Sequence, residues 1–141
     1  MISPYIVTII ASWLVAQGAK YVVAVIKNRT FRAFRHFYIS GNMPSAHSAT
    51  VVSVATLIGC REGFGSAIFG LALTLAGIVM YDAVMVRRSV GEQGLAIRAI
   101  IEAAHNKLLF PRSAKGHTPV EVLVGAGVGV VIGYVVFIAT R

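Results

Sequence analysis

The chain has 141 residues, of which 57% are apolar and 13% are charged. This composition lies outside the usual range of soluble domains and predicts a single integral membrane domain over residues 1–141. The net charge of +8 is compatible with nucleic-acid binding. The long apolar runs argue against this and favour anionic lipid headgroups as the partner. The single cysteine, Cys60, excludes an internal disulfide.

Four apolar segments without an internal proline follow one another along the chain. The first, 4–26, is long enough to span a bilayer, and with no basic residue before it we expect a retained helix rather than a signal peptide. The second, 44–60, is short for a span, so its polar start should lie inside the protein. The third and fourth cover 63–86 and 119–140. In the last, Gly125, Gly129 and Gly133 either permit close helix approach or reflect the general frequency of glycine in spanning helices.

The connectors between these segments differ in charge. The charges of Arg61 and Glu62 cancel in the second connector, whereas the first and third carry most of the basic residues: Lys27, Arg29, Arg32 and Arg35, then Arg87, Arg88, Arg98, Lys107, Arg112 and Lys115. The positive-inside rule therefore predicts that the first and third connectors are cytoplasmic and that both termini lie outside.

Both basic connectors also show helical spacing. In the first connector the aromatic residues recur at helical spacing, which indicates either an interfacial helix or a basic loop with aromatic anchors. They are Phe31, Phe34, Phe37 and Tyr38. The third predicts a cytoplasmic or interfacial helix packed on the bundle, on the pattern of Ile97, Ile100, Ala104 and Leu108. The fold class is therefore an all-α, multi-pass bundle of about four spanning helices plus one or two interfacial helices.

Polar residues gather at one end of the four segments. If the segments alternate in direction, all of them meet on the cytoplasmic face, where ionisable groups at membrane depth mark function. Two histidines, several cations and a carboxylate suit chemistry on a phosphate. The clusters are Gln17 and Lys20; Ser45, His47 and Ser48; Tyr81, Asp82, Arg87 and Arg88; and residues 116–121.

Each cluster has a structural alternative. Thr118, Pro119 and Glu121 form a well-capped helix start, but this leaves His117 unexplained. Glu121 could orient one ring nitrogen of His117 and leave the other as a nucleophile. At the second helix, Ser45 either helps to bind phosphate or caps the helix with Ser48.

His47 either donates a proton to a leaving group or faces the lipid headgroups. Lys20 either neutralises phosphate or snorkels toward headgroups. Arg87 and Arg88 either bind phosphate or simply flank the membrane, and Asp82 should pair with a cation or a catalytic group. No zinc-type spacing is present, and Asp82 with Glu121 is weak support for a metal site.

Three runs in order resemble the divergent PAP2 family, small membrane proteins related to type-2 phosphatidic acid phosphatases and vanadium haloperoxidases. They are Gly-Asn-Met-Pro-Ser-Ala-His-Ser-Ala at 41–49, Val-Met-Tyr-Asp-Ala at 79–83 with Val86-Arg87-Arg88, and Gly-His-Thr-Pro-Val-Glu-Val at 116–122. The resemblance covers nearly the whole chain. It implies that His117 is the nucleophile, Glu121 its orienting partner, His47 the acid and Ser45 a phosphate ligand.

The phosphate-binding motifs of the wider superfamily are altered. Lys20 carries over, but Lys27 and Asn28 stand where an Arg-Pro pair is expected. Pro111 stands at an arginine position, with Arg112 one residue late, so the resemblance leaves Arg87 or Arg88 to replace that cation.

The prediction is a PAP2-like membrane phosphatase acting through a phosphohistidine, without a metal or other cofactor. Candidate substrates at the cytoplasmic leaflet are phosphatidylglycerol phosphate, phosphatidic acid or a polyprenyl phosphate or pyrophosphate. The alternatives are a non-catalytic protein that binds lipid headgroups or anions or takes part in transport, and a vanadate-dependent oxidase, which a membrane-embedded pocket disfavours. A homodimer could complete the pocket, and the sequence does not decide between a monomer and a dimer.

Overall fold

The computed structural model describes residues 3–28, 43–104, 109–110 and 116–141, and the elements in these ranges are all helical. They are α1 (Pro4–Asn28), α2 (Ala46–Glu62), α3 (Ala67–Tyr81), the π-helical turn η2 (Asp82–Val86), α4 (Arg87–Ala103) and α5 (Pro119–Ala139). The predicted all-α class is confirmed. The amphipathic pattern predicted for the first connector, around Phe31, lies outside the described residues.

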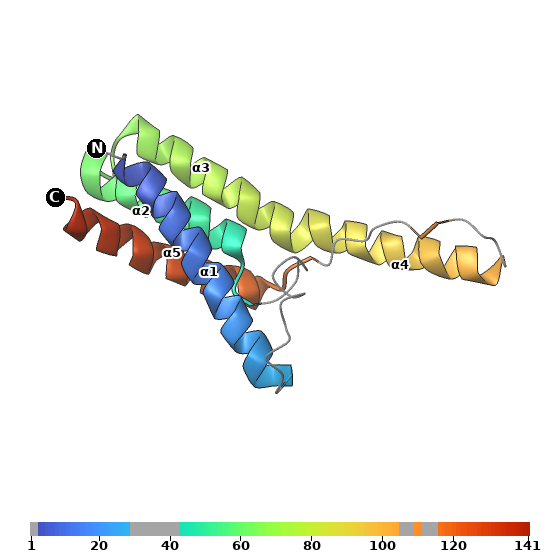
Figure 1. The fold of residues 1–141 in the computed structure, drawn as a ribbon. Coiled ribbons are helices and arrows are strands. Elements are labelled where there is room, and N and C mark those ends of the chain that lie inside the picture. Colours follow the sequence, from blue (N-terminus) through green and yellow to red (C-terminus); the bar gives the residue numbers. More distant parts are fainter. Residues whose placement is uncertain (1–2, 29–42, 105–108, 111–115) are drawn as a thin grey trace.

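The four long helices of the bundle alternate in direction (Figure 1). α1 and α3 run one way, whereas α2 and α5 run the other way, so that the two termini lie at the same end. Two contacts tie this end together: Tyr5 Oη donates to Glu62 Oε1 at 3.0 Å, and Arg61 Nη2 donates to the Thr140 carbonyl at 2.6 Å. The polar clusters therefore lie at the opposite end.

α2 and α5 lie in parallel and pack through small residues. A Cβ added to Gly125 would lie 2.5 Å from the Ser45 carbonyl oxygen, and one added to Gly129 would lie 2.5 Å from the Ala49 carbonyl oxygen. A Cβ on Gly133 would in turn collide with the Ser53 carbonyl. The glycines thus bring two backbones into direct contact, which confirms the close approach predicted for them. Because the helices are parallel, both of their N-termini lie at the polar end.

Among the described residues, three helical stretches are long and apolar enough to cross a membrane: Pro4–Ile26, Ala67–Ala103 and Pro119–Ala139. α2 has 17 residues, which corresponds to about 25 Å and falls short of a hydrocarbon core about 30 Å thick. It packs against α1, α3 and α5. The short second segment is thus held by protein at its polar start, where Ser45 is buried.

α4 continues directly from α3 and η2 and extends beyond the bundle as a single rod (Figure 1). None of its residues is buried, and Ile100 remains 68% exposed. The prediction of a separate helix packed on the bundle is therefore wrong. No proline interrupts residues 63–103, and a π-helical turn carries the backbone hydrogen bonding through from α3 to α4, so the chain does not fold back.

Candidate functional site

The capping of α5 builds the centre of the site. Thr118 accepts a hydrogen bond from Glu121 N at 3.3 Å, and Glu121 Oε2 accepts one from Thr118 N at 3.1 Å. The same carboxylate oxygen lies 2.9 Å from Nδ1 of His117, whose side chain is only 4% exposed. Because an ionised carboxylate only accepts hydrogen bonds, this contact makes Nδ1 of His117 the donor, and in the neutral ring Nε2 then carries the lone pair.

His117 is also held through its backbone. Its N–H donates to the carbonyl of Ala83 in η2 at 3.0 Å. Gly116, directly before it, lies so close to α4 that an added Cβ would stand 2.5 Å from both Cα and N of Arg88. The segment that carries the histidine is therefore pressed against the junction of η2 and α4.

α2 supplies the second histidine of the site. The backbone N–H of Ser45 donates to the Glu121 carbonyl at 3.0 Å, which fixes the start of α2 against α5. His47 lies on the first turn of α2, outside the three spanning helices. Although its side chain reaches solvent, desolvation by the surrounding protein lowers the pKa of His47. The positive charges of Arg87 and Lys20 lower it further, as does His117 when its ring is protonated, against the opposing effect of Asp82.

Contacts of Ser45 with Glu121, of His117 with Ala83 and of Gly116 with Arg88 bring the starts of α2 and α5 to η2, and charge interactions link them to α1. His47 of α2 interacts with Lys20 of α1, with Asp82 and Arg87 at η2, and with His117 before α5. Lys20 is 8% exposed and is acted on by the carboxylate of Glu121. The convergence expected from alternating helix directions is therefore present in the described part of the chain.

The two neighbouring arginines, Arg87 and Arg88, pair with different carboxylates. Arg87 Nε donates to Asp82 Oδ2 at 2.6 Å, which confirms that Asp82 pairs with a cation. Arg88 Nε instead donates to Glu92 Oε1 at 3.1 Å on the exposed side of α4.

Two further polar side chains lie inside the protein. Ser45 is fully buried, and its hydroxyl accepts hydrogen bonds from Ser48 N at 3.4 Å and Ser48 Oγ at 2.9 Å, so it caps α2. Gln17 Oε1 is buried without a hydrogen-bond partner in the described ranges.

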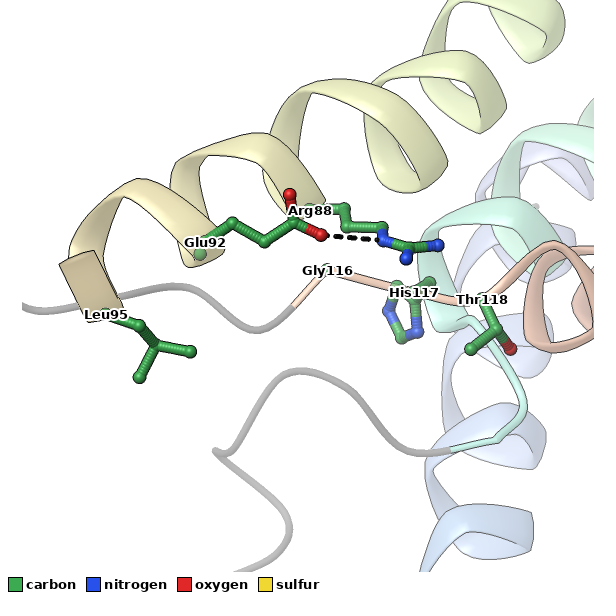
Figure 2. A pocket seen from close by; sticks show the side chains of 7 residues that line it. Arg88, Glu92, Leu95, Gly116, His117 and Thr118 are labelled. Carbon is green, nitrogen blue, oxygen red and sulfur yellow. Dashed lines mark hydrogen bonds and ion pairs between the residues drawn. The ribbon is translucent and has the colours of Figure 1, made fainter.

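A cavity of about 510 Å³ opens beside His117. Figure 2 shows His117 and Thr118, on the segment that leads into α5, facing Arg88, Glu92 and Leu95 of α4. The cavity is bounded by Arg88, Gly91, Glu92, Leu95, Gly116, His117 and Thr118. The buried histidine thus borders a space large enough for a small polar headgroup.

The sequence analysis placed Gly116 in the cluster at 116–121 without assigning it a role, and it did not include Ala83 in the site. A glycine directly before His117 was a usable signal for Gly116, because close backbone approach favours glycine. The contribution of Ala83 comes from a backbone carbonyl, for which the residue type gives no signal. Within the described ranges no three His, Cys, Asp or Glu residues are grouped as metal ligands would be. Asp82 and Glu121 are instead engaged by Arg87 and His117.

Comparison with known proteins gives two matches. A family model described as "Divergent PAP2 family" matches residues 2–132. The uncharacterized membrane protein YuiD of Bacillus subtilis (strain 168) is 32% identical over 109 residues, which cover 66% of this chain and 68% of YuiD. No solved structure matches the chain. Together with the three apolar helices, these similarities establish an integral membrane protein.

Proposed function

We propose that this chain, which belongs to the divergent PAP2 family, is a membrane phosphatase that hydrolyses the phosphomonoester of a lipid. The observation that carries the proposal is the 2.9 Å contact between His117 Nδ1 and Glu121 Oε2. It lies beside a cavity at the end of the bundle opposite the termini. This contact leaves the Nε2 lone pair available for attack on phosphorus.

The first chemical step forms a phosphohistidine. Nε2 of His117 attacks phosphorus, and the bond from phosphorus to the lipid oxygen breaks. Glu121 stabilises the positive charge that develops on the imidazole, because its carboxylate already accepts from Nδ1. His47 donates its proton to the departing oxygen, so the lipid leaves as an alcohol.

Water completes the cycle. His47, now neutral, takes a proton from the attacking water as the water oxygen bonds to phosphorus. The bond from phosphorus to Nε2 breaks, inorganic phosphate leaves and the histidine regains its lone pair. The net reaction consumes one phosphomonoester and one water and yields one alcohol and one phosphate.

The charge of the phosphate is balanced by groups around the two histidines. Lys20 and Arg87 both act on His47, so a phosphate beside this histidine meets two cations. The start of α2 adds backbone N–H groups and the positive end of its dipole. Arg88 borders the cavity from the other side. Ser45, buried and capping α2, would contribute by fixing this start rather than by direct contact.

The substrate class follows from the position of these groups. They lie at one end of the bundle, where a lipid with its tail in the bilayer presents its headgroup. With the basic connectors on the cytoplasmic side, the substrate is a phosphorylated lipid of the cytoplasmic leaflet. Phosphatidylglycerol phosphate, phosphatidic acid and polyprenyl phosphates all have the required chemistry.

The test is phosphate release by the purified protein in detergent, measured with each of these lipids. We expect release by the wild type, release at background by His117→Ala, and a fall in kcat of about 100-fold in Glu121→Gln, which loses the orienting carboxylate. Glu102→Gln is the matched control, because Glu102 is exposed on α4 and pairs with Arg98. A phosphohistidine trapped in alkali should be present in the wild type and absent from His117→Ala.

Two results would contradict the proposal. Equal release by the wild type and His117→Ala would exclude the phosphohistidine route. Release from none of the lipids, with phosphate binding preserved in both forms, would instead favour a non-catalytic protein that binds headgroups or anions.

A further inference from the structure

We propose that the π-helical turn η2 is the device that positions His117, because it frees the carbonyl of Ala83 to bind the histidine backbone. The kinetic part of this inference rests on the proposed phosphatase reaction, and its structural part does not. Ala83 and Gly116 are then positioning residues, because they act through His117.

The first step is the hydrogen bonding inside the helix. In a regular α-helix the N–H of Arg87 would donate to the carbonyl of Ala83, four residues earlier. In η2 it donates to the carbonyl of Asp82, five residues earlier. The carbonyl of Ala83 is therefore released from its regular partner at this point, and the buried oxygen accepts the N–H of His117 at 3.0 Å.

The second step is the approach of the segment that carries the histidine. A residue larger than glycine at 116 would place its Cβ 2.5 Å from Cα and N of Arg88. This distance is well below van der Waals contact between carbon atoms, so a side chain at 116 would push the segment away from η2. Gly116 therefore permits the hydrogen bond from His117 to Ala83.

The third step is the pairing of Asp82 and Arg87 across the same turn. Five residues make about one turn of a π-helix, so both side chains lie on one face, and Arg87 Nε reaches Asp82 Oδ2 at 2.6 Å. The same Arg87 acts electrostatically on His47. One turn thus fixes the backbone of the proposed nucleophile and the side chain of a proposed phosphate-binding cation.

A single deletion separates these two roles. Deleting Met85, which is 54% exposed, leaves four residues where η2 has five and converts the turn to a regular α-helix. Arg87 N then still donates to Asp82 O, now four residues away, and the two side chains stay paired. Ala83 O becomes the regular acceptor of Arg88 N and is taken from His117. The helix itself keeps all its hydrogen bonds, so the variant is expected to fold.

The experiment compares the Met85 deletion with Gly116→Ala, which pushes the same segment away from Arg88 and leaves the sequence of the helix unchanged. For both we expect kcat to fall about 100-fold, because the nucleophile is displaced by about 1 Å. We expect KM to stay near the wild-type value, because Lys20 and Arg87 are unchanged. Gly77→Ala on α3 is the matched control, since nothing lies within 4 Å of the added Cβ. Hydrogen exchange of the His117 amide, measured by NMR, should accelerate in both variants and not in the control.

The exchange measurement keeps this inference separate from the proposed function. A wild type without phosphatase activity, whose His117 amide loses protection in the Met85 deletion, would refute the reaction and retain the positioning device. Wild-type kcat together with unchanged exchange in either folded variant would overturn the positioning role. Should the deletion not fold, Gly116→Ala decides the question by the same two measurements.

Discussion

Glu121 combines a structural and a proposed chemical role in one oxygen atom. Its Oε2 accepts from the backbone of Thr118, which completes the capping box of α5, and from Nδ1 of His117. The two explanations offered by the sequence, a helix cap and an orienting carboxylate, are therefore two contacts of the same oxygen atom. Fixing the carboxylate to the helix start also fixes the ring, because capping restrains the rotamer of Glu121 before His117 binds it.

The pH dependence of the proposed reaction should report His47. Burial, Arg87 and Lys20 hold the pKa of His47 below its ordinary value of 6.5, and the first step requires the protonated form. We therefore expect the alkaline limb of kcat/KM to fall as the pH rises through this lowered pKa. Arg87→Gln removes a positive charge, so its pH profile should show the fall at higher pH than in the wild type.

The substrate phosphate titrates in a similar range, but identically for both proteins, so only the difference between the two profiles is assigned to His47. A fall at the same pH in both would remove His47 from the role of acid. His47→Asn should lose the His47-dependent fall altogether and lower kcat by about 100-fold.

At this scale the sequence predicted contacts that depend on local spacing. The four-residue separation of His117 and Glu121 and the five-residue separation of Asp82 and Arg87 both place side chains on one helical face or cap. The sequence could not distinguish a capping role from a phosphate-binding role for Ser45, because both use the same hydroxyl. The structure places that hydroxyl in the cap, fully buried between α2 and α5.

Among the elements, the parallel pair α2 and α5 determines where the site forms. Their glycine and serine contacts set the relative height of the two helices, so that the first turn of α2 lies beside Glu121. The small-residue spacing of Gly125, Gly129 and Gly133 was visible in the sequence. The partner helix was not, because such spacing fits any backbone that approaches closely.

Gly129→Ala should destabilise the protein by about 1–3 kcal/mol, because its Cβ would meet the carbonyl of Ala49 at 2.5 Å in a packed interface. Gly127→Ala is the control on the same helix, since nothing lies within 4 Å of its Cβ. It should be neutral or stabilising by up to about 1 kcal/mol. Equilibrium unfolding in mixed detergent measures both, and equal stabilities of the two variants would contradict the packing described for α2 and α5.

The continuity of α3 and α4 could not be predicted from periodicity. A π-helical turn is an irregularity of hydrogen bonding rather than of residue type, and Asp-Ala-Val-Met-Val at 82–86 carries no glycine or proline to mark it. The positive charges of Arg87 and Arg88 suggested the end of a membrane-spanning helix. The backbone nevertheless continues as a helix through these arginines.

For the molecule as a whole, both termini lie at one end and the proposed site at the other. The positive-inside rule then predicts termini outside the cytoplasm and a cytoplasmic site. In a Cys60→Ser background, cysteines placed at either terminus should react with an impermeant thiol reagent on intact cells. A cysteine at Glu102, exposed on α4, should react only after the membrane is opened. The reverse pattern would place the site on the outer face.

The rod formed by α3, η2 and α4 makes the proposed site sensitive to the thickness of the bilayer. α4 adds 17 residues, or about 26 Å, after η2, and the helical backbone is continuous from Ala67 to Ala103. A spanning helix adjusts to a thinner or thicker bilayer by tilting. Because Ala83 and the cavity wall at Arg88 belong to this rod, each such tilt is transmitted to the backbone of His117. We therefore expect lipid chain length to alter the geometry of the proposed site, whichever headgroup it binds.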